Sequence, residues 1–128
     1  MAQIKVYGRR SAWSKVRAEL SDAIHESLAG AWRMPTDKRF QRFIWLDDDD
    51  LVAPLRGERY LVVEVLAFTG RSREAKRALI GALFERLCTG FDLSVDDLEI
   101  VLLESPQESW GIRGVSGDEL TLTYPVSI

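Results

Sequence analysis

The chain has 128 residues, of which 46% are hydrophobic and 29% charged, and these proportions are typical of one soluble globular domain. Its net charge of −3 argues against a nucleic-acid-binding protein, and it has no apolar run near the roughly 20 residues that span a bilayer. Its one cysteine, Cys88, excludes an internal disulfide and fits a reducing cytoplasm. From these three features together we expect a cytoplasmic protein without membrane or nucleic-acid partners.

The first predicted elements are a strand and a long helix. Residues 2–7 alternate between apolar and polar side chains, which predicts a strand with one face toward water. After a turn at Gly8–Ser11, apolar residues recur at helical spacing until Met34 and Pro35 end the helix. The predicted apolar stripe comprises Trp13, Val16, Leu20, Ala23, Ile24, Ser27, Leu28 and Ala31. His25 lies beside this stripe, where a lone histidine is more often structural than catalytic.

Charged residues surround the next strand, which we predict at Phe40–Leu46. Lys38, Arg39 and Arg42 stand at its entry, and these cations could bind an anion or could form a solvated edge. Four consecutive carboxylates follow at Asp47–Asp50. They lack the spaced ligands and the glycine of a calcium loop, so a solvated turn is the better interpretation.

A second strand, turn and helix occupy the middle of the chain. Tyr60–Phe68 is a nearly continuous apolar run, which predicts a strand buried on both faces. The turn Thr69–Ser72 leads into a helix with Ser72 as its N-cap. The predicted stripe of this helix comprises Ala75, Ala78, Leu79, Ala82, Leu83 and Leu87. A further strand is predicted at Leu98–Leu103.

The chain therefore contains the same order of elements twice. A gapless overlay of the two halves pairs Ile4 with Val65, Tyr7 with Phe68, Arg10 with Arg71, Ser11 with Ser72 and Lys15 with Lys76. Right-handed strand–helix–strand crossovers would make each pair of strands parallel. The overlay favours an internal duplication at about residues 2–46 and 60–103, although any two amphipathic helices look alike. We predict one domain over residues 1–128, with a C-terminal segment at 104–128.

The C-terminal segment ends in a predicted edge strand. Residues Glu119–Tyr124 alternate between polar and apolar side chains. A short terminal strand with an apolar face can pair with another chain, so this pattern suggests an oligomer.

Four motifs follow one another along the chain. They are DAIHESL at Asp22–Leu28, P-x-x-x-R-F-Q at Pro35–Gln41, the Gly70–Ser72 turn with Lys76 after it, and the segment around Trp110. Together with the repeated elements, they resemble the tautomerase superfamily, in the branch that contains malonate semialdehyde decarboxylase. The resemblance covers most of the chain. It implies an α+β fold of tandem βαβ units, with a four-stranded mixed sheet, two antiparallel helices on one face, a C-terminal hairpin and usually a trimeric assembly.

The resemblance also implies where the chemistry lies. The family uses an N-terminal proline, exposed by removal of the initiator methionine, and this position is Ala2 here. The decarboxylase-type aspartate corresponds to Lys38, and the first of two pocket arginines corresponds to Thr69. The second arginine and the pocket tryptophan match Arg71 and Trp110.

A different amine could replace the proline. If Met1 is removed, Ala2 presents a primary amine whose pKa is ordinarily about 7.7–8.0. Burial and nearby cations such as Arg71, Arg39 or Lys38 would lower that pKa and favour a neutral base near pH 7. Such an amine could move a proton next to a carbonyl or form a Schiff base with it.

The other candidate residues would bind the substrate. Arg71 would hold a carboxylate through two hydrogen bonds, Trp110 would exclude water, and Lys38 and Arg39 would add positive charge. Arg71 could instead bond to a carboxylate elsewhere in the fold. Trp110 could instead be a core or interface aromatic.

Two functions are consistent with these residues. The first is an isomerase of the keto–enol tautomerase type, acting on a small carboxylated keto or enol acid with Ala2 and Arg71 as catalytic residues. The alternative is a non-catalytic or chemically diverged trimer that retains only an anion-binding pocket. In both cases we expect a small carboxylate ligand and a homotrimer, without a cofactor or a metal.

Overall fold

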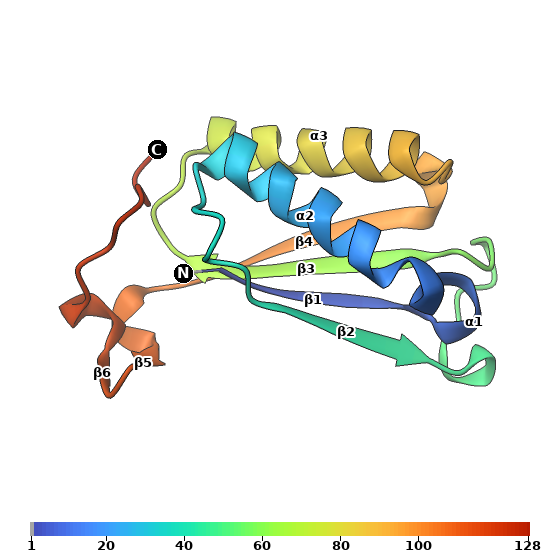
Figure 1. Cartoon of the computed structure of the whole chain (residues 1–128), viewed down its shortest axis with the longest axis horizontal. Helices are drawn as coiled ribbons and strands as arrows, with labels where there is room; N and C mark the ends of the chain where they lie inside the picture. Colours follow the sequence, from blue (N-terminus) through green and yellow to red (C-terminus); the bar gives the residue numbers. More distant parts are fainter. Residues whose placement is uncertain (1) are drawn as a thin grey trace.

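The computed structural model describes residues 2–128, which form a four-stranded sheet with helices on one face (Figure 1). The strands stand in the order β2-β1-β3-β4. Their bounds are Ala2–Arg9 for β1, Gln41–Leu46 for β2, Leu61–Phe68 for β3 and Leu98–Ser105 for β4. The helices are α1 (Arg10–Trp13), α2 (Arg17–Trp32) and α3 (Arg73–Gly90), and a hairpin follows with β5 (Gly111–Ile112) and β6 (Val115–Ser116).

The strand directions follow from the way the helices connect them. β1 and β2 are parallel and joined by α2, and β3 and β4 are parallel and joined by α3. The two pairs meet along the antiparallel contact between β1 and β3. A helical crossover returns the second strand in the same direction as the first, which explains both parallel pairs. The predicted mixed sheet with two antiparallel helices and a C-terminal hairpin is confirmed.

The core lies between the sheet and the two long helices. Residues of β1 and β3 alternate between buried and half-buried positions, because neighbouring side chains point to opposite faces. The fully buried set on these strands includes Ile4, Val6, Leu61, Val63 and Val65. The prediction that Tyr60–Phe68 is buried on both faces is wrong, since Val62, Glu64 and Leu66 face away from the helices and stay half-buried.

The two long helices begin in different ways. The Ser72 hydroxyl accepts a hydrogen bond from the Ala75 amide at 3.1 Å, so Ser72 is the predicted N-cap of α3. The first helical segment is interrupted by a 3-10 turn at Ser14–Val16, between α1 and α2. The buried residues are Leu20, Ile24, His25, Ser27, Leu28 and Trp32 on α2, and Ala75, Leu79, Leu83 and Leu87 on α3.

The C-terminal segment differs from the prediction. Glu119–Tyr124 forms no strand within the described chain, because a 3-10 turn at Gly117–Glu119 leads into an irregular tail. The alternation has another cause, since Leu122, Tyr124 and Val126 pack against the core of their own chain. The predicted edge strand is therefore wrong, and the tail gives no indication of an oligomer.

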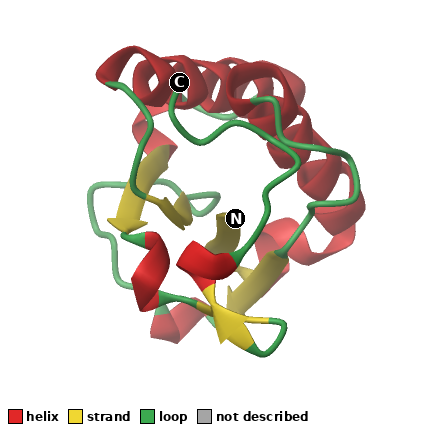
Figure 2. Cartoon of the chain, turned by 90° about the vertical axis from the view of Figure 1, so that its left-hand side faces the viewer, coloured by secondary structure: helices red, strands yellow, loops and turns green. Residues whose placement is uncertain are grey.

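The tail crosses the end of the sheet where β1 starts and β3 ends (Figures 1 and 2). It passes so close to Gly70, at φ 148°, that an added Cβ there would lie 2.9 Å from Val126 Cγ1. The Ser72 hydroxyl donates a hydrogen bond to the carbonyl oxygen of Ile128 at 2.9 Å. The tail thus covers the turn that follows β3.

Candidate functional site

Three of the predicted site residues, Ala2, Arg71 and Trp110, lie at one end of the sheet. Ala2 opens β1 and pairs with Ala67 near the end of β3, because the two strands run antiparallel. Ala2 is buried, with 5% exposure. Figure 2 looks onto this end, where the hairpin, the tail and the loop between α2 and β2 surround the start of β1. Met1, whose removal would expose the Ala2 amine, lies outside the described residues.

Arg71 lies in the turn after β3, and it is only 4% exposed. Its Nη1 donates to the Phe68 carbonyl oxygen at 3.3 Å, and its guanidinium carbon stacks 4.2 Å from the centre of the Trp32 ring. Nε and Nη2 have no hydrogen-bond partner within residues 2–128. These two nitrogens share one edge of the guanidinium, which is the edge that binds both oxygens of a carboxylate.

The charge of Arg71 is not balanced by a bonded acid. Burial lowers the pKa of Arg71 to about 10, while the negative charge of Glu104 acts in the opposite direction. The guanidinium therefore stays protonated at neutral pH. Glu104 itself is bound by Lys76 at 2.5 Å, and among the described residues no carboxylate is hydrogen-bonded to Arg71. A buried cation of this kind is costly unless an anion joins it.

Trp110 reaches the same end from the hairpin side. Its ring meets Phe68 edge-on, with ring centres 5.0 Å apart and planes at 84°. The Gly117 amide donates to the Trp110 carbonyl oxygen at 2.8 Å. An added Cβ on Gly117 would collide with the carbonyl oxygen of Gln107, so the chain passes here without a side chain. The buried indole N–H of Trp110 has no partner in the part of the chain that the structure describes.

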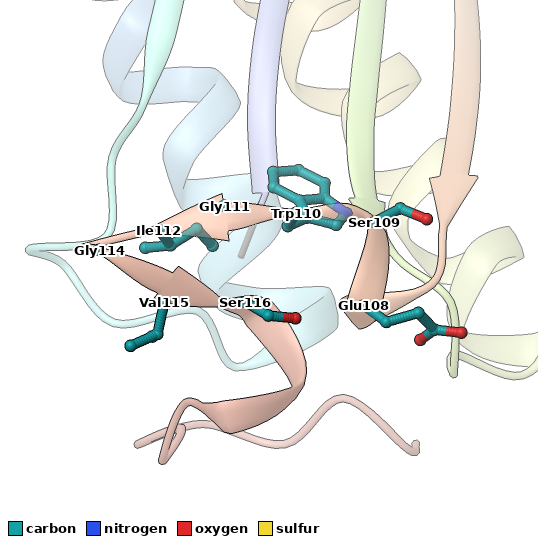
Figure 3. Close-up of a pocket in the computed structure, with 8 residues that line it drawn as sticks. All are labelled: Glu108, Ser109, Trp110, Gly111, Ile112, Gly114, Val115 and Ser116. Atoms are coloured by element: carbon teal, nitrogen blue, oxygen red, sulfur yellow. The ribbon is translucent and has the colours of Figure 1, made fainter.

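The hairpin and the residues just before it line an open cavity of about 480 Å³ (Figure 3). In Figure 3 the Trp110 indole lies toward the ends of β1 and β3, whereas Val115 points away from them. The charged side chain in the lining is Glu108, which is negative. A carboxylate ligand is therefore better matched to Arg71 than to the hairpin side of Trp110.

Lys38 lines a second, smaller cavity of about 100 Å³. Arg113 at the tip of the hairpin and residues 120–124 of the tail complete its wall. Tyr124 is 8% exposed, and its hydroxyl group has no hydrogen-bond partner among residues 2–128. The structure thus places Lys38 beside a cation that the sequence analysis did not select.

Arg39 is held elsewhere. Its Nη1 lies 2.6 Å from Asp22 Oδ1 and 3.3 Å from the Ser21 hydroxyl, both on α2. It lines a separate cavity of about 280 Å³ with Gln3 and Arg42. The two neighbouring cations, Lys38 and Arg39, therefore belong to different cavities.

His25 and the acidic loop at Asp47–Asp50 take part in packing and in a hydrogen bond within the fold. His25 is 3% exposed, and burial lowers its pKa with the help of the positive charge of Arg39, so the imidazole is neutral at pH 7. The acidic loop is tied to the first turn, because the Ser11 hydroxyl donates to Asp48 at 2.8 Å.

Within residues 2–128 there is neither a metal-binding cluster nor a membrane-spanning helix. This part of the chain holds no group of three or more His, Cys, Asp or Glu residues that could bind a metal ion. None of its helices has the length and apolar character needed to cross a membrane.

The sequence analysis missed three residues at this end: Trp32, Arg113 and Tyr124. Arg113 and Gly114 form the two-residue turn of the hairpin, with φ of 50° and 85°. A glycine in such a position is a known hairpin signal, and it could have indicated the turn. Trp32 ends the first helical stripe, which was a usable signal as well. The alternation at Glu119–Tyr124 marks Tyr124 as facing a core, but its place beside Lys38 depends on the path of the tail.

A family model described as "Tautomerase enzyme" matches residues 38–113, which is more than half of the chain. The chain belongs to the tautomerase family. The matched region includes Lys38, Arg71 and Trp110, whereas Ala2 and the tail lie outside it. This tautomerase-family chain is also 32% identical over 54 residues to the probable tautomerase RSp0893 of Ralstonia nicotianae, a match that covers 42% of this chain and 77% of that protein.

Solved structures of similar proteins share the fold of this tautomerase-family chain. FG41 malonate semialdehyde decarboxylase, inhibited by 3-bromopropiolate, is 24% identical with a TM-score of 0.82, over 96% of this chain and 99% of that chain. A symmetric trimer of a fused 4-OT is 21% identical with a TM-score of 0.78, over 91% of this chain and 96% of that chain. At these identities the similarity supports the fold.

Proposed function

We propose that this protein is a keto–enol tautomerase-type enzyme for a small carboxylated keto or enol acid. The observation that carries the proposal is the buried Arg71 guanidinium, whose Nε and Nη2 lack partners throughout residues 2–128. A substrate carboxylate would accept hydrogen bonds from both nitrogens and would balance the buried charge. Membership of the tautomerase family supports the reaction class.

Ala2 supplies the base in this proposal. Ala2 pairs with Ala67, and Arg71 bonds to the carbonyl oxygen of the next residue, Phe68, so base and cation share one end of the sheet. A neutral amine takes a proton from the carbon beside the ketone, and the ammonium so formed gives that proton to the carbonyl oxygen; the reverse transfers restore the ketone and the neutral amine. The exchange moves one proton between carbon and oxygen without a net change in atoms. Trp110, packed on Phe68, would limit the access of water.

We further propose that this chain is a diverged relative of the malonate semialdehyde decarboxylase branch of the family. The similarity to the FG41 enzyme over nearly the whole chain supports this placement. At three positions where the family resemblance implies a proline, an aspartate and an arginine, this chain has Ala2, Lys38 and Thr69. A decarboxylation that depends on the missing aspartate is therefore not expected, whereas proton transfer requires only a base and a carboxylate-binding cation.

A homotrimer forms part of the proposal. Two similar fused 4-OT structures are described as symmetric and asymmetric trimers. In this chain Val101 and Leu103 of β4 face away from the helices and are 41% and 44% exposed. A neighbouring subunit would bury these side chains.

We also propose that the chain is one domain, at residues 1–128, built by duplication. The segments β1–α2–β2 and β3–α3–β4 share the order of their elements and the direction of their strands. This supports repeats at about residues 2–46 and 60–103. The cytoplasmic location stays a proposal that rests on the single cysteine, Cys88.

The experiment that tests the function has two steps. Mass spectrometry should identify Ala2 as the first residue, since a retained Met1 would leave no α-amine at that position. The conversion of the enol form of phenylpyruvate is then followed by ultraviolet absorbance, with the uncatalysed rate in buffer as the reference. In a variant that keeps two extra residues before Ala2, the rate of conversion should fall to that in buffer. An undiminished rate would contradict the role of the amine.

The alternative function is an anion-binding protein without turnover. The alanine in place of the family's proline favours it, because a primary amine replaces the secondary amine of the relatives. Binding of a carboxylate together with a rate equal to that of buffer would support this alternative. A large gain in rate for Ala2→Pro would show that the remainder of the site is competent.

A further inference from the structure

The Arg71 guanidinium rests on the face of a tryptophan from the other half of the chain. Trp32 is the last residue of α2, it is 1% exposed, and the centre of its ring lies 4.2 Å from the guanidinium carbon of Arg71. A tryptophan face attracts an arginine through the ring quadrupole, and the attraction is strongest away from water. The ring therefore stabilises the buried positive charge and uses none of the N–H groups at the edge of the guanidinium.

Trp32 is itself held in place by a hydrogen bond. Its indole N–H donates to the carbonyl oxygen of Ala75 at 2.9 Å, and this bond is buried. Ala75 lies in the first turn of α3, and its amide donates to the N-cap Ser72, the residue after Arg71. The end of α2 is thereby fixed to the start of α3, so the ring that supports Arg71 and the turn that carries Arg71 keep one relative position.

The chain contains a second arginine–tryptophan pair whose donors are used differently. The guanidinium carbon of Arg59 lies 5.1 Å from the centre of the Trp13 ring, and the Trp13 indole N–H donates to the Arg59 carbonyl oxygen at 3.0 Å. Both terminal nitrogens of Arg59 donate to backbone carbonyl oxygens, to Asp92 at 3.0 Å and to Phe91 at 2.6 Å. The Arg59 guanidinium is thus used within the fold, whereas Arg71 keeps Nε and Nη2 without partners among residues 2–128.

The contacts of Arg71 limit how an anion can reach it. The Trp32 ring lies against one face of the guanidinium, and Nη1 is bonded to the Phe68 carbonyl oxygen at 3.3 Å. The open group is the edge with Nε and Nη2, and the two contacts keep that edge in one direction. A carboxylate can bond to both nitrogens, and a donor that is already oriented spares the entropy of ordering it.

We propose that Trp32 is a positioning residue of the site, whose ring holds the Arg71 guanidinium so that its Nε and Nη2 edge meets a ligand carboxylate in a fixed orientation. The inference rests on the proposed function, in which Arg71 binds the carboxylate of the substrate. Trp32 acts through Arg71 and needs no contact with the substrate. Because Trp32 belongs to the first half of the chain and Arg71 to the second, the site depends on how α2 packs against the start of α3.

The test measures carboxylate binding and needs no turnover. Acetate and benzoate, which carry a carboxylate but no ketone, are titrated into the full chain at fixed ionic strength and followed by NMR through the indole N–H signals. In the parent protein the Trp32 signal should shift, because the anion neutralises the charge on its ring, and the Trp13 signal should stay in place. Trp32→Leu should raise the Kd of the tighter-binding probe about tenfold, since an unsupported Arg71 side chain must be ordered on binding. Trp32→Phe keeps an aromatic face and should raise this Kd about twofold.

Trp13→Leu is the matched control. Both leucine variants lose a buried indole that is hydrogen-bonded to a carbonyl oxygen and stacked against an arginine, so both should lower the melting temperature. Only Trp32→Leu should raise the Kd of the carboxylate. If a leucine variant does not fold, Trp32→Phe and Trp13→Phe give the same comparison, and the indole signals of the parent protein decide independently.

Three results would overturn the inference. They are an unchanged Kd in folded Trp32→Leu, equal increases of the Kd in the Trp32 and Trp13 variants, and a Trp32 indole signal that acetate and benzoate leave in place. Failure of the proposed function looks different. Trp32-dependent carboxylate binding without any enol conversion would contradict the enzyme but support the positioning role, whereas enol conversion with the same KM in the parent and in Trp32→Leu would do the reverse.

Discussion

The two strand-to-helix turns of this protein carry the same Arg-Ser pair in opposite surroundings. Arg10 follows β1, its side chain is 61% exposed, and its Nε lies 3.7 Å from Asp47. Arg71 follows β3 at the other end of the sheet and is 4% exposed. The serines differ too, since Ser72 caps α3 whereas Ser11 donates to Asp48 in a loop.

The tail of the chain lies beside one of these two turns. Val126 packs over Gly70 and Ile128 accepts a hydrogen bond from Ser72, so the second turn is covered by the end of the chain. The tail lies at the opposite end of the sheet from the first turn (Figure 1). The Arg-Ser pair therefore does not by itself determine burial, because the end of the chain packs beside the second turn and not beside the first.

The largest expected effect comes from replacing Arg71, with the same replacement of Arg10 as the control. Arg71→Met should lower kcat/KM for the enol acid about 100-fold, because about 3 kcal/mol of carboxylate binding is lost. Its folded state should be as stable as the parent or more stable, since an apolar side chain replaces a buried unpaired cation. Arg10→Met is the matched control and should leave kcat/KM unchanged. Equal kcat/KM values for the two variants would contradict the comparison.

The second prediction removes the cover from the Arg71 turn. Val126→Ala combined with Ile128→Ala should lower the free energy of unfolding by about 2 kcal/mol, because partly buried apolar contacts are lost. Val52→Ala with Leu55→Ala is the control, since those side chains are 86% and 88% exposed and should cost almost nothing. Urea unfolding measures both pairs. A similar loss in the control pair would show that the tail makes no special contribution.

The two serines provide a smaller and sharper contrast. Ser72→Ala should cost about 1 kcal/mol of unfolding free energy, because an N-cap is lost. Ser11→Ala should cost less than about 0.5 kcal/mol, since its hydrogen bond to Asp48 is exposed. Thermal unfolding followed by circular dichroism separates the two values. If Ser11→Ala were the more damaging change, the contrast between the turns would fail.

The last prediction concerns the buried titratable group of the first half, His25. Its pKa in the folded protein is lowered from 6.5, so below pH 6.5 the unfolded chain binds a proton that the folded chain refuses. Stability should therefore fall as the pH drops below 6.5, by at most about 1.4 kcal/mol per pH unit from this residue. His25→Gln should show a shallower decline in urea unfolding between pH 7 and pH 5. Parallel declines would show that His25 does not titrate in this way.

Much of the fold could be predicted because its signals are local. The alternation of residues 2–7, the helical stripes and the N-cap Ser72 each depend on neighbours in the sequence, and periodicity reports such neighbours directly. The family resemblance also selected Arg71 and Trp110, which meet at Phe68.

The errors concern contacts between distant segments. The alternation of Glu119–Tyr124 was interpreted as a strand, but it records packing of the tail against its own core. The apolar run at Tyr60–Phe68 gave no sign that the helices cover only one face of the sheet. Arg113 was missed because its place beside Lys38 depends on distant segments that share one cavity.

Gly117 fixes the position of Trp110 from seven residues away, through its amide and through the absence of a side chain. Any larger residue at 117 would have to push aside the Gln107 carbonyl oxygen and the Cβ of Trp110. Position 117 therefore influences where Trp110 lies without contributing a chemical group of its own. Graded substitution there, from alanine to valine, offers an engineer a way to displace Trp110 while the identity of every site residue is kept.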